Sequence, residues 1–373
     1  MNQRHRAILA LTTAAIATAS LAACSSDQTE DTASSAASTP ADGTSTQAAA
    51  TDNGAITLTN CGQEVTYDKH DRLMVNDGNI IASALAAGAK DKIVAVSSIN
   101  RDMDILEAKF GDEVADLKQV SKEYPSLEEI ISQKPDVYVA GWGYGFGEAE
   151  NITPESLKDK GIGSYFLTES CKQEDGKARG VEDPWKSVTD DLHNLGVIAG
   201  NEDAAAAAIK DQDERLAHLG TLEMAETKPV AFLFDSGSDT IFTSGRFGAP
   251  QAIIEAAGAT NATADVEDTW TKVGWEKLAS ADPDVIVFVD YPGQSLEEKI
   301  AVLESNPVSK NLKAVKEHRY INLPYAMWTP GPLSIDAAEH MRKALEHFGL
   351  EPESKLSPQL SLPESLPGQQ YFS

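Results

Sequence analysis

Two stretches of the chain, residues 127–139 and residues 275–287, repeat the same order of local signals. Each begins with a short helical pattern, continues into Pro-Asp, and ends in a run of apolar residues that fits a buried strand. A second echo lies upstream of each stretch, because Ala-Ala-Gly-Ala closes a predicted helix at residues 86–89 and again at 256–259. Two echoes in the same order indicate a duplicated unit. We therefore expect two similar lobes.

Each lobe is predicted to be of the α/β class, with a central, largely parallel sheet. The helices in the first half are expected to begin near residues 79, 126 and 154, and the first helix of the second half near residue 250. Short strands alternating with helices are typical of Rossmann-like lobes, and 373 residues leave room for two of them. Strands are expected at residues 71–75, 93–96, 137–139, 164–167, 230–234 and 285–287.

A helical stretch of different composition separates the two halves. A short helix is expected over residues 184–195, broken at Gly196 and Gly200, and Asn201 is expected to begin a longer helix that reaches about Met224. A helix of about 24 residues is about 36 Å long, which is enough to join two lobes. Packing against one lobe only is the alternative.

The N-terminus carries an export signal. Arg4 and Arg6 precede an apolar run that is too short to span a bilayer, and the run ends in Leu-Ala-Ala before Cys24. This pattern resembles the lipobox of bacterial lipoproteins, which implies removal of residues 1–23 and acylation of Cys24, for example with palmitate. An ordinary signal peptide with an incidental cysteine is the alternative. Residues 24–54 have the composition of a disordered tether.

The net charge of the chain excludes some classes of partner, and its cysteines bear on the compartment in which it works. A formal net charge of -27 argues against nucleic acid as a partner and against a surface that lies on anionic lipid. With Cys24 acylated, the two remaining thiols are Cys61 and Cys171. We expect them to form a disulfide outside the cytoplasm, and two buried free thiols are the alternative.

Several segments together resemble the solute-binding lipoproteins of ABC importers for iron–siderophore complexes, haem and cobalamin. The resemblance implies a first lobe over residues 55–183, a helical connection over 184–226 and a second lobe over 227–350. It also implies a cleft between lobes joined by one long helix. Residues 351–373 contain several prolines and no apolar period, so we expect them to form a loosely attached C-terminal extension. The segments are 60–62, 126–136, 195–204, 248–261 and 323–325.

The same resemblance implies a function. The protein is expected to capture a metal chelate as a monomer on the outer face of the cell membrane, without a cofactor of its own, and to deliver it to an ABC permease and its ATPase. Glu128 matches the acid that docks the first lobe on the permease, and Glu255 is the candidate on the second lobe. Solvated helix acids without a partner are the alternative for both.

Ligand-binding residues are sought in the loops that follow the strands, because ligands meet parallel sheets at the carboxyl ends of their strands. These loops are rich in aromatic rings, which suit a large planar or amphipathic ligand. Some of the rings are expected only to plug the sheet ends, and Arg246 has a surface salt bridge as its alternative role. The candidates are Arg101, Trp142, Tyr144, Phe146, Arg246, Phe247, Tyr291, Tyr325 and Trp328.

The negative charge of the chain disfavours strongly anionic ferric catecholates unless these arginines converge, so a hydroxamate siderophore or a corrinoid fits better. Direct metal coordination is not expected, because no histidine lies in a strand-end loop. Catalysis is also not expected: the sequence has neither a Gly-x-Ser-x-Gly elbow nor a His-Glu-x-x-His motif. A lipoprotein that senses its ligand is the remaining alternative.

Overall fold

The computed structural model describes residues 49–50 and 54–371. The expected signal segment, the lipidation site Cys24 and most of the tether at 24–54 lie outside these residues. Within the described part of the chain, no helix is long and apolar enough to cross a membrane.

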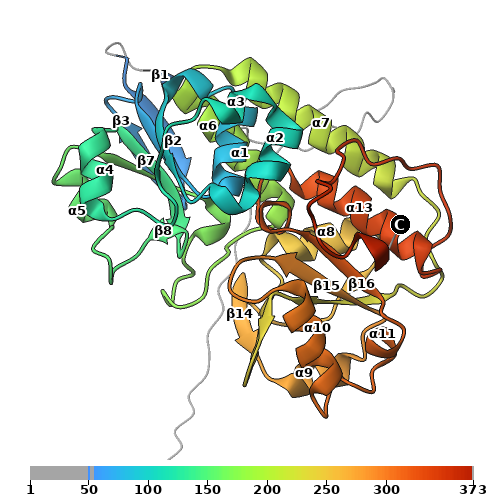
Figure 1. Ribbon diagram of the computed structural model, residues 1–373. Helices are drawn as coiled ribbons and strands as arrows, with labels where there is room; N and C mark the ends of the chain where they lie inside the picture. Colours follow the sequence, from blue (N-terminus) through green and yellow to red (C-terminus); the bar gives the residue numbers. More distant parts are fainter. Residues whose placement is uncertain (1–48, 51–53, 372–373) are drawn as a thin grey trace, which may run out of the picture. The chain divides into compact units, whose positions relative to one another are not determined.

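The first lobe is built on a parallel sheet with the strand order β6-β5-β4-β7, and β8 and β9 both pair with β7 (Figure 1). Its strands are β4 (Leu73–Asn76), β5 (Ile93–Ser97), β6 (Gln119–Ser121), β7 (Val137–Trp142), β8 (Gly145–Phe146) and β9 (Gly163–Phe166). Its helices are α1 (Gly78–Ala86), α2 (Met103–Phe110), α3 (Asp112–Ala115), α4 (Leu127–Gln133) and α5 (Pro154–Lys158), with 3-10 turns η1 (Lys90–Lys92), η2 (Asn100–Asp102) and η3 (Thr168–Ser170).

The second lobe has a parallel sheet with the order β13-β10-β15-β16 and a separate antiparallel sheet β11-β12-β14. Its strands are β10 (Val230–Phe234), β11 (Ser236–Gly237), β12 (Ile241–Ser244), β13 (Thr260–Asn261), β14 (Trp270–Val273), β15 (Val285–Asp290) and β16 (Tyr320–Pro324). Its helices are α8 (Ala249–Ala256), α9 (Trp275–Ala281), α10 (Leu296–Ser305), α11 (Lys313–Lys316), α12 (Tyr325–Trp328) and α13 (Ser334–His347).

The expected two-lobed α/β architecture is confirmed, and the two parallel sheets share one topology. The order β5-β4-β7-β9 in the first lobe corresponds to β13-β10-β15-β16 in the second, so each places its second strand beside its first. The repeated Pro-Asp has the same task in both lobes. The carboxylate of Asp136 accepts the Asp71 N–H at 3.0 Å, and the carboxylate of Asp284 accepts the Val230 N–H at 2.9 Å. Each aspartate thereby fixes the start of the third strand to the start of the first.

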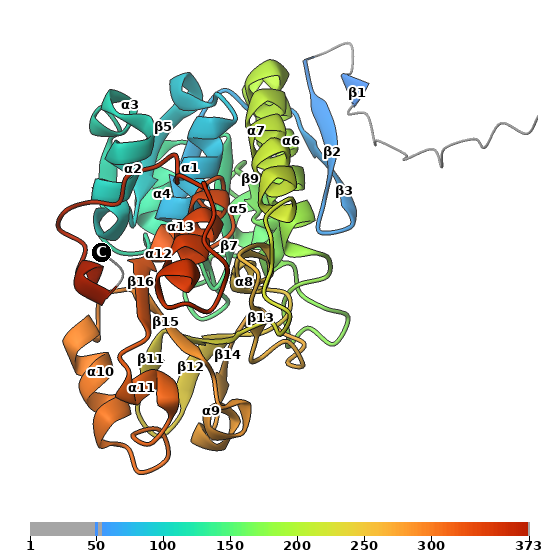
Figure 2. The ribbon, with the colours of Figure 1, turned by 90° about the vertical axis from the view of Figure 1, so that its right-hand side faces the viewer.

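Two helices, α6 (Pro184–Ala199) and α7 (Glu202–Gly220), connect the lobes and run side by side (Figure 2). Both pack against α1 of the first lobe and α8 of the second. The predicted break at Gly196 is wrong: the helix continues to Ala199, and a Cβ on Gly196 would lie 2.5 Å from the Cβ of Ala205 on α7. This glycine permits close packing of the two helices. The second helix ends at Gly220, earlier than expected.

A hairpin opens the described part of the first lobe. Strands β2 (Ile56–Asn60) and β3 (Gln63–Tyr67) pair antiparallel, and the two-residue strand β1 (Ala49–Ala50) pairs with β2. The turn between β2 and β3 holds Cys61, which forms a disulfide with Cys171, 110 residues further along the chain. The disulfide attaches the hairpin to the chain directly after η3.

The C-terminal segment is packed, in contrast to the expected loose attachment. Leu356 and Leu360 are 6% and 7% exposed and belong to the main hydrophobic core. The hydroxyl of Ser365 donates to Asp104 on α2 at 2.6 Å, so the segment reaches from the second lobe to the first. It ends in the 3-10 turn η4 (Gln369–Tyr371). The sequence pattern did not reveal this, because these leucines are buried singly by an irregular chain that has no helical or strand period.

Candidate functional site

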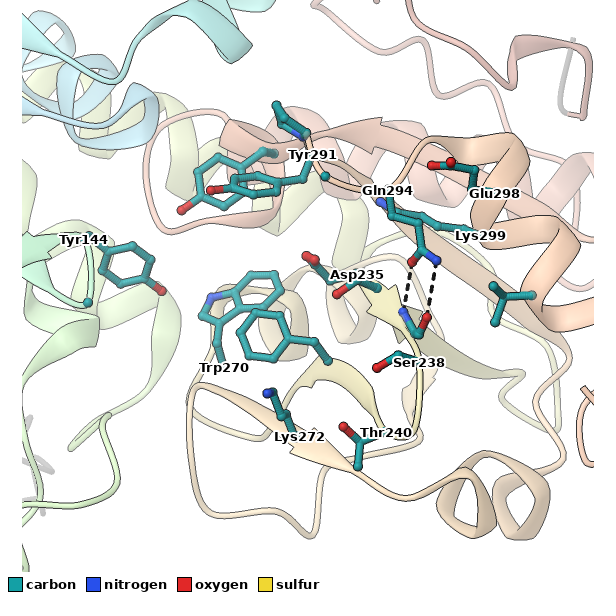
Figure 3. Close-up of a pocket in the computed structure, with 18 of the residues that line it drawn as sticks. Tyr144, Asp235, Ser238, Thr240, Trp270, Lys272, Tyr291, Gln294, Glu298 and Lys299 are labelled. Atoms are coloured by element: carbon teal, nitrogen blue, oxygen red, sulfur yellow. Dashed lines mark hydrogen bonds between the residues drawn. The ribbon is translucent and has the colours of Figure 1, made fainter. Parts of the chain in front are cut away.

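A cavity of about 940 Å³ lies where the carboxyl ends of strands from both parallel sheets meet (Figure 3). The first lobe contributes the turn after β7 and the loop after β6, and the second lobe contributes the loops after β10 and β15 together with β12, β14 and α10. Gln294 fixes one wall, because its side chain exchanges hydrogen bonds of 2.9 and 3.3 Å with the backbone of Gly237. The residues that line the cavity include Tyr124, Tyr144, Arg179, Asp235, Ser238, Thr240, Phe242, Trp270, Lys272, Tyr291, Glu298, Lys299 and Tyr325.

Aromatic rings dominate the apolar part of the wall. Three of them, Tyr144, Tyr291 and Tyr325, were candidates from the sequence, and the rings of Tyr291 and Tyr325 pack at 4.9 Å. Phe242 and Trp270, whose ring centres lie 5.9 Å apart on the antiparallel sheet, were not predicted from the sequence. That sheet was not predicted, because its strands are only two to four residues long. Strands β11 and β12 lie within what reads as a glycine-rich loop, and β14 lies further along the chain, after α8.

A buried network around Asp77 joins the lobes behind the tyrosines. Arg101 pairs with Asp77 at 3.2 Å, and the hydroxyls of Tyr124 and Tyr325 donate to the same carboxylate at 2.9 and 3.2 Å. Burial raises the pKa of Asp77, while Arg101 and the two hydroxyls oppose the rise. The guanidinium of Arg101 also lies 4.8 Å from the ring centre of Tyr291. Arg101 is therefore engaged within the wall and is not part of the cavity lining.

A second group joins the lobes around Glu169 of η3. One carboxylate oxygen accepts the N–H of Ala249 at the start of α8 at 2.8 Å, and the other accepts the hydroxyl of Tyr144 at 3.1 Å. Burial raises the pKa of Glu169 to about 7, against the effect of these hydrogen bonds and of Arg179. Arg179 donates to the carbonyls of Trp142 and Trp270, one on each lobe, at 2.8 and 3.3 Å. Glu169 and Arg179 were not among the candidates from the sequence, because both lie in or next to an irregular segment without a strand signal.

Three predicted aromatic candidates lie away from the cavity lining and pack within the lobes. Trp142 stacks on Phe166 at 5.4 Å, and Phe146, which is 2% exposed, packs on the same ring at 4.4 Å. Trp328 is fully buried, and its indole N–H donates to the carbonyl of Phe288 at 3.0 Å. These rings fill the ends of the sheets, which was the alternative role for part of the set.

Arg246 and Phe247 lie together in a different hollow of about 800 Å³, between the start of α6, the end of α7 and α8. The guanidinium of Arg246 pairs with Glu267 at 3.3 Å, and both side chains are exposed. Glu255, the second predicted docking acid, lines the same hollow. The structure therefore separates Arg246 from the aromatic cavity.

The duplicated topology relates Glu128 to a residue other than Glu255. Glu128 is exposed in the first turn of α4, the helix that leads into β7. The helix in the same place in the second lobe is α9, which leads into β15, and its exposed first-turn acid is Glu276. Glu255 instead lies in the last turn of α8.

Among residues 54–371, no group of three histidine, cysteine, aspartate or glutamate side chains is arranged to hold a metal ion. Two parallel-sheet lobes, a helical connection and a large cavity at their strand ends define the class of binding proteins that capture a solute between two lobes.

The chain belongs to the periplasmic binding protein family, whose sequence model matches residues 75–326. The vitamin B12-binding protein of Pectobacterium atrosepticum is 24% identical over 208 residues, which are 55% of this chain and 66% of that protein. The chain thus spans just under two thirds of the length of this curated relative. The relatives in this comparison are solute-binding proteins and not enzymes.

Solved structures share the fold. A protein of an ABC-type Fe3+-hydroxamate transport system from Saccharomonospora viridis has a TM-score of 0.64 at 22% identity, covering 78% of this chain and 98% of that one. A periplasmic haem-binding protein from Pseudomonas aeruginosa has a TM-score of 0.56 at 19% identity, covering 79% and 96%.

Proposed function

We propose that this protein is a lipid-anchored, monomeric binding protein that captures a ferric hydroxamate siderophore or a similar metal chelate and delivers it to an ABC permease. The observation that carries the proposal is the cavity of about 940 Å³ with aromatic walls from both lobes. Its size lies at the upper end of the range for small-molecule sites and suits a chelate better than a single amino acid or a bare ion.

The charges of the wall favour a chelate that is not strongly anionic. Arg101 is paired with Asp77, and Arg246 lies in the other hollow, so the predicted arginines do not converge on the cavity. Arg179 lines it, but two of its donors are occupied by backbone carbonyls. A ferric catecholate of high negative charge therefore finds few unpaired cations, whereas hydroxamate complexes need fewer of them.

Cobalamin and haem are the alternative cargoes, since relatives of this chain are named for binding them. A titration of the purified protein with a ferric trihydroxamate, cyanocobalamin and haemin separates the three. Ligand at 100 times its dissociation constant adds about 2.7 kcal/mol of apparent stability. We expect the trihydroxamate to raise the melting temperature most. A rise with a sugar or an amino acid and with none of these three would reject the proposed cargo.

Trp270 and Trp142 form a matched pair for locating the site. Trp270 lines the cavity, and its buried indole N–H has no partner among the described residues, whereas Trp142 packs within the first lobe. Trp270→Phe should weaken chelate binding at least about tenfold, because it removes aromatic ring surface from the cavity wall. Trp142→Phe should leave affinity unchanged. Equal effects of the two variants would place the ligand elsewhere.

We further propose that the permease is gripped by Glu128 on the first lobe and by Glu276 on the second, because the duplication gives them equivalent places. Chelate uptake by cells separates docking from binding. Glu128→Ala and Glu276→Ala should each reduce uptake and leave chelate affinity intact, while Glu255→Ala serves as the matched control. Uptake lost only with Glu255→Ala would restore the assignment made from the sequence. Full affinity with normal uptake after deletion of the permease would favour a sensor.

A further inference from the structure

Asp235 occupies a central position on the wall that the second lobe presents to the cavity. It directly follows β10, so it lies at the carboxyl end of a strand of the parallel sheet, and its backbone N–H donates to the carbonyl of Phe242 at 3.0 Å. Its carboxylate points into the cavity between Trp270 and Tyr291 (Figure 3). The residue is only 7% exposed, so little water reaches this charge.

No cation of the described residues forms an ion pair with Asp235. Lys299, which lowers the pKa of Asp235 through its charge, is buried, and its ammonium donates to the carbonyl of Val289 while it also faces Asp290. Ser236 supplies one hydrogen bond to the Asp235 carboxylate. Burial raises the pKa of Asp235 to about 6, against the effects of Lys299 and Ser236, so the group is ionised at pH 7.5. Lys299 thus faces two carboxylates, Asp235 and Asp290, and its single charge neutralises at most one of them.

We propose that Asp235 is the subsite for a cationic arm of the ligand, so that the preferred cargo is a metal chelate that carries an ammonium group. This inference rests on the proposed function, since it specifies the ligand of the same cavity. A buried carboxylate without an ion-pair partner is costly unless a cation reaches it, and an ammonium would supply a charge-assisted hydrogen bond. The neighbouring faces of Tyr291 and Trp270 also favour a cation.

The test compares two ferric trihydroxamates that differ only at one end. The first carries a free primary ammonium, and in the second the same amine is acetylated and therefore neutral. Both are titrated into the purified protein by isothermal titration calorimetry at pH 7.5. We expect the ammonium form to bind about tenfold more tightly, which corresponds to about 1.4 kcal/mol. In the Asp235→Asn variant this preference should disappear.

Glu297→Gln is the matched control, because Glu297 is an exposed acid in the first turn of α10 that does not line the cavity. This variant loses the same charge and should keep the preference. Equal affinity of the two chelates for the unmodified protein overturns the inference and leaves the proposed function intact; this result does not depend on the folding of any variant. If neither chelate binds, while haemin or cyanocobalamin does, the proposed cargo falls together with the inference.

Discussion

The buried carboxyl of Glu169 makes a quantitative prediction about pH and stability. Its pKa rises from the ordinary 4.5 to about 7 because it is buried between the lobes. The folded state therefore holds this proton more tightly than the unfolded chain. The resulting stabilisation is complete below pH 4.5 and is lost as the pH rises through 7. At 1.36 kcal/mol for each pH unit, ionised Glu169 costs the folded state about 3 kcal/mol at pH 8.

Glu169→Gln removes this cost and keeps both contacts. The amide oxygen can accept the N–H of Ala249, and the amide nitrogen can donate to the hydroxyl of Tyr144, so the tie between the lobes persists. Relative to the unmodified protein, the variant should gain about 3 kcal/mol in unfolding free energy between pH 4.5 and pH 8. Asp102 and Asp191, whose pKa values burial raises to about 8 and about 7, titrate in both proteins and cancel in the difference.

Urea unfolding followed by circular dichroism at the two pH values gives the four free energies needed. Glu174→Gln, at an exposed position in the nearby irregular segment, controls for the loss of one negative charge. The reasoning is refuted if the difference between Glu169→Gln and the unmodified protein is the same at pH 4.5 and pH 8. It is also refuted if Glu174→Gln shows an equal change.

Two further predictions concern the C-terminal segment and the disulfide between Cys61 and Cys171. Leu360→Ala should lower the free energy of unfolding in urea by about 2–5 kcal/mol, because it removes a side chain from the hydrophobic core. The exposed Glu364→Ala is the control, and an equally small effect of both variants would mean that the C-terminal segment is loosely attached. The Cys61→Ser, Cys171→Ser double variant opens a loop closed over 110 residues and should lose up to about 5 kcal/mol in the chain-entropy model. An unchanged melting temperature under reducing conditions would contradict the stabilising role.

The duplicated lobes were predictable from the sequence because the signals that define them are local. Pro-Asp followed by an apolar run marks the third strand in both halves, and the structure shows the physical reason in the hydrogen bonds of Asp136 and Asp284. Tyr144, Tyr291 and Tyr325 could be predicted for the same reason, since each closely follows a strand of a parallel sheet.

The rest of the cavity depends on contacts between distant segments. Trp270 and Phe242 enter the wall through a small antiparallel sheet whose strands are too short for a periodic signal. Arg179 enters through an irregular segment that follows the disulfide. Arg101 and Arg246 occur in loops of the expected kind, but each forms an ion pair with an acid, Asp77 and Glu267 respectively, and these pairs keep both guanidinium groups away from the cavity. No pattern along the chain encodes those pairings.

The position of bound iron shows whether the aromatic cavity is the ligand site. A crystal of the protein with the ammonium-bearing ferric trihydroxamate, measured at the iron absorption edge, locates the metal by anomalous scattering. We predict one iron peak inside the cavity, held in a chelate that contacts Tyr144, Trp270 and Tyr291. A peak in the hollow beside Arg246 and Glu255, or a saturated protein whose iron lies outside the space between the two sheets, would contradict it.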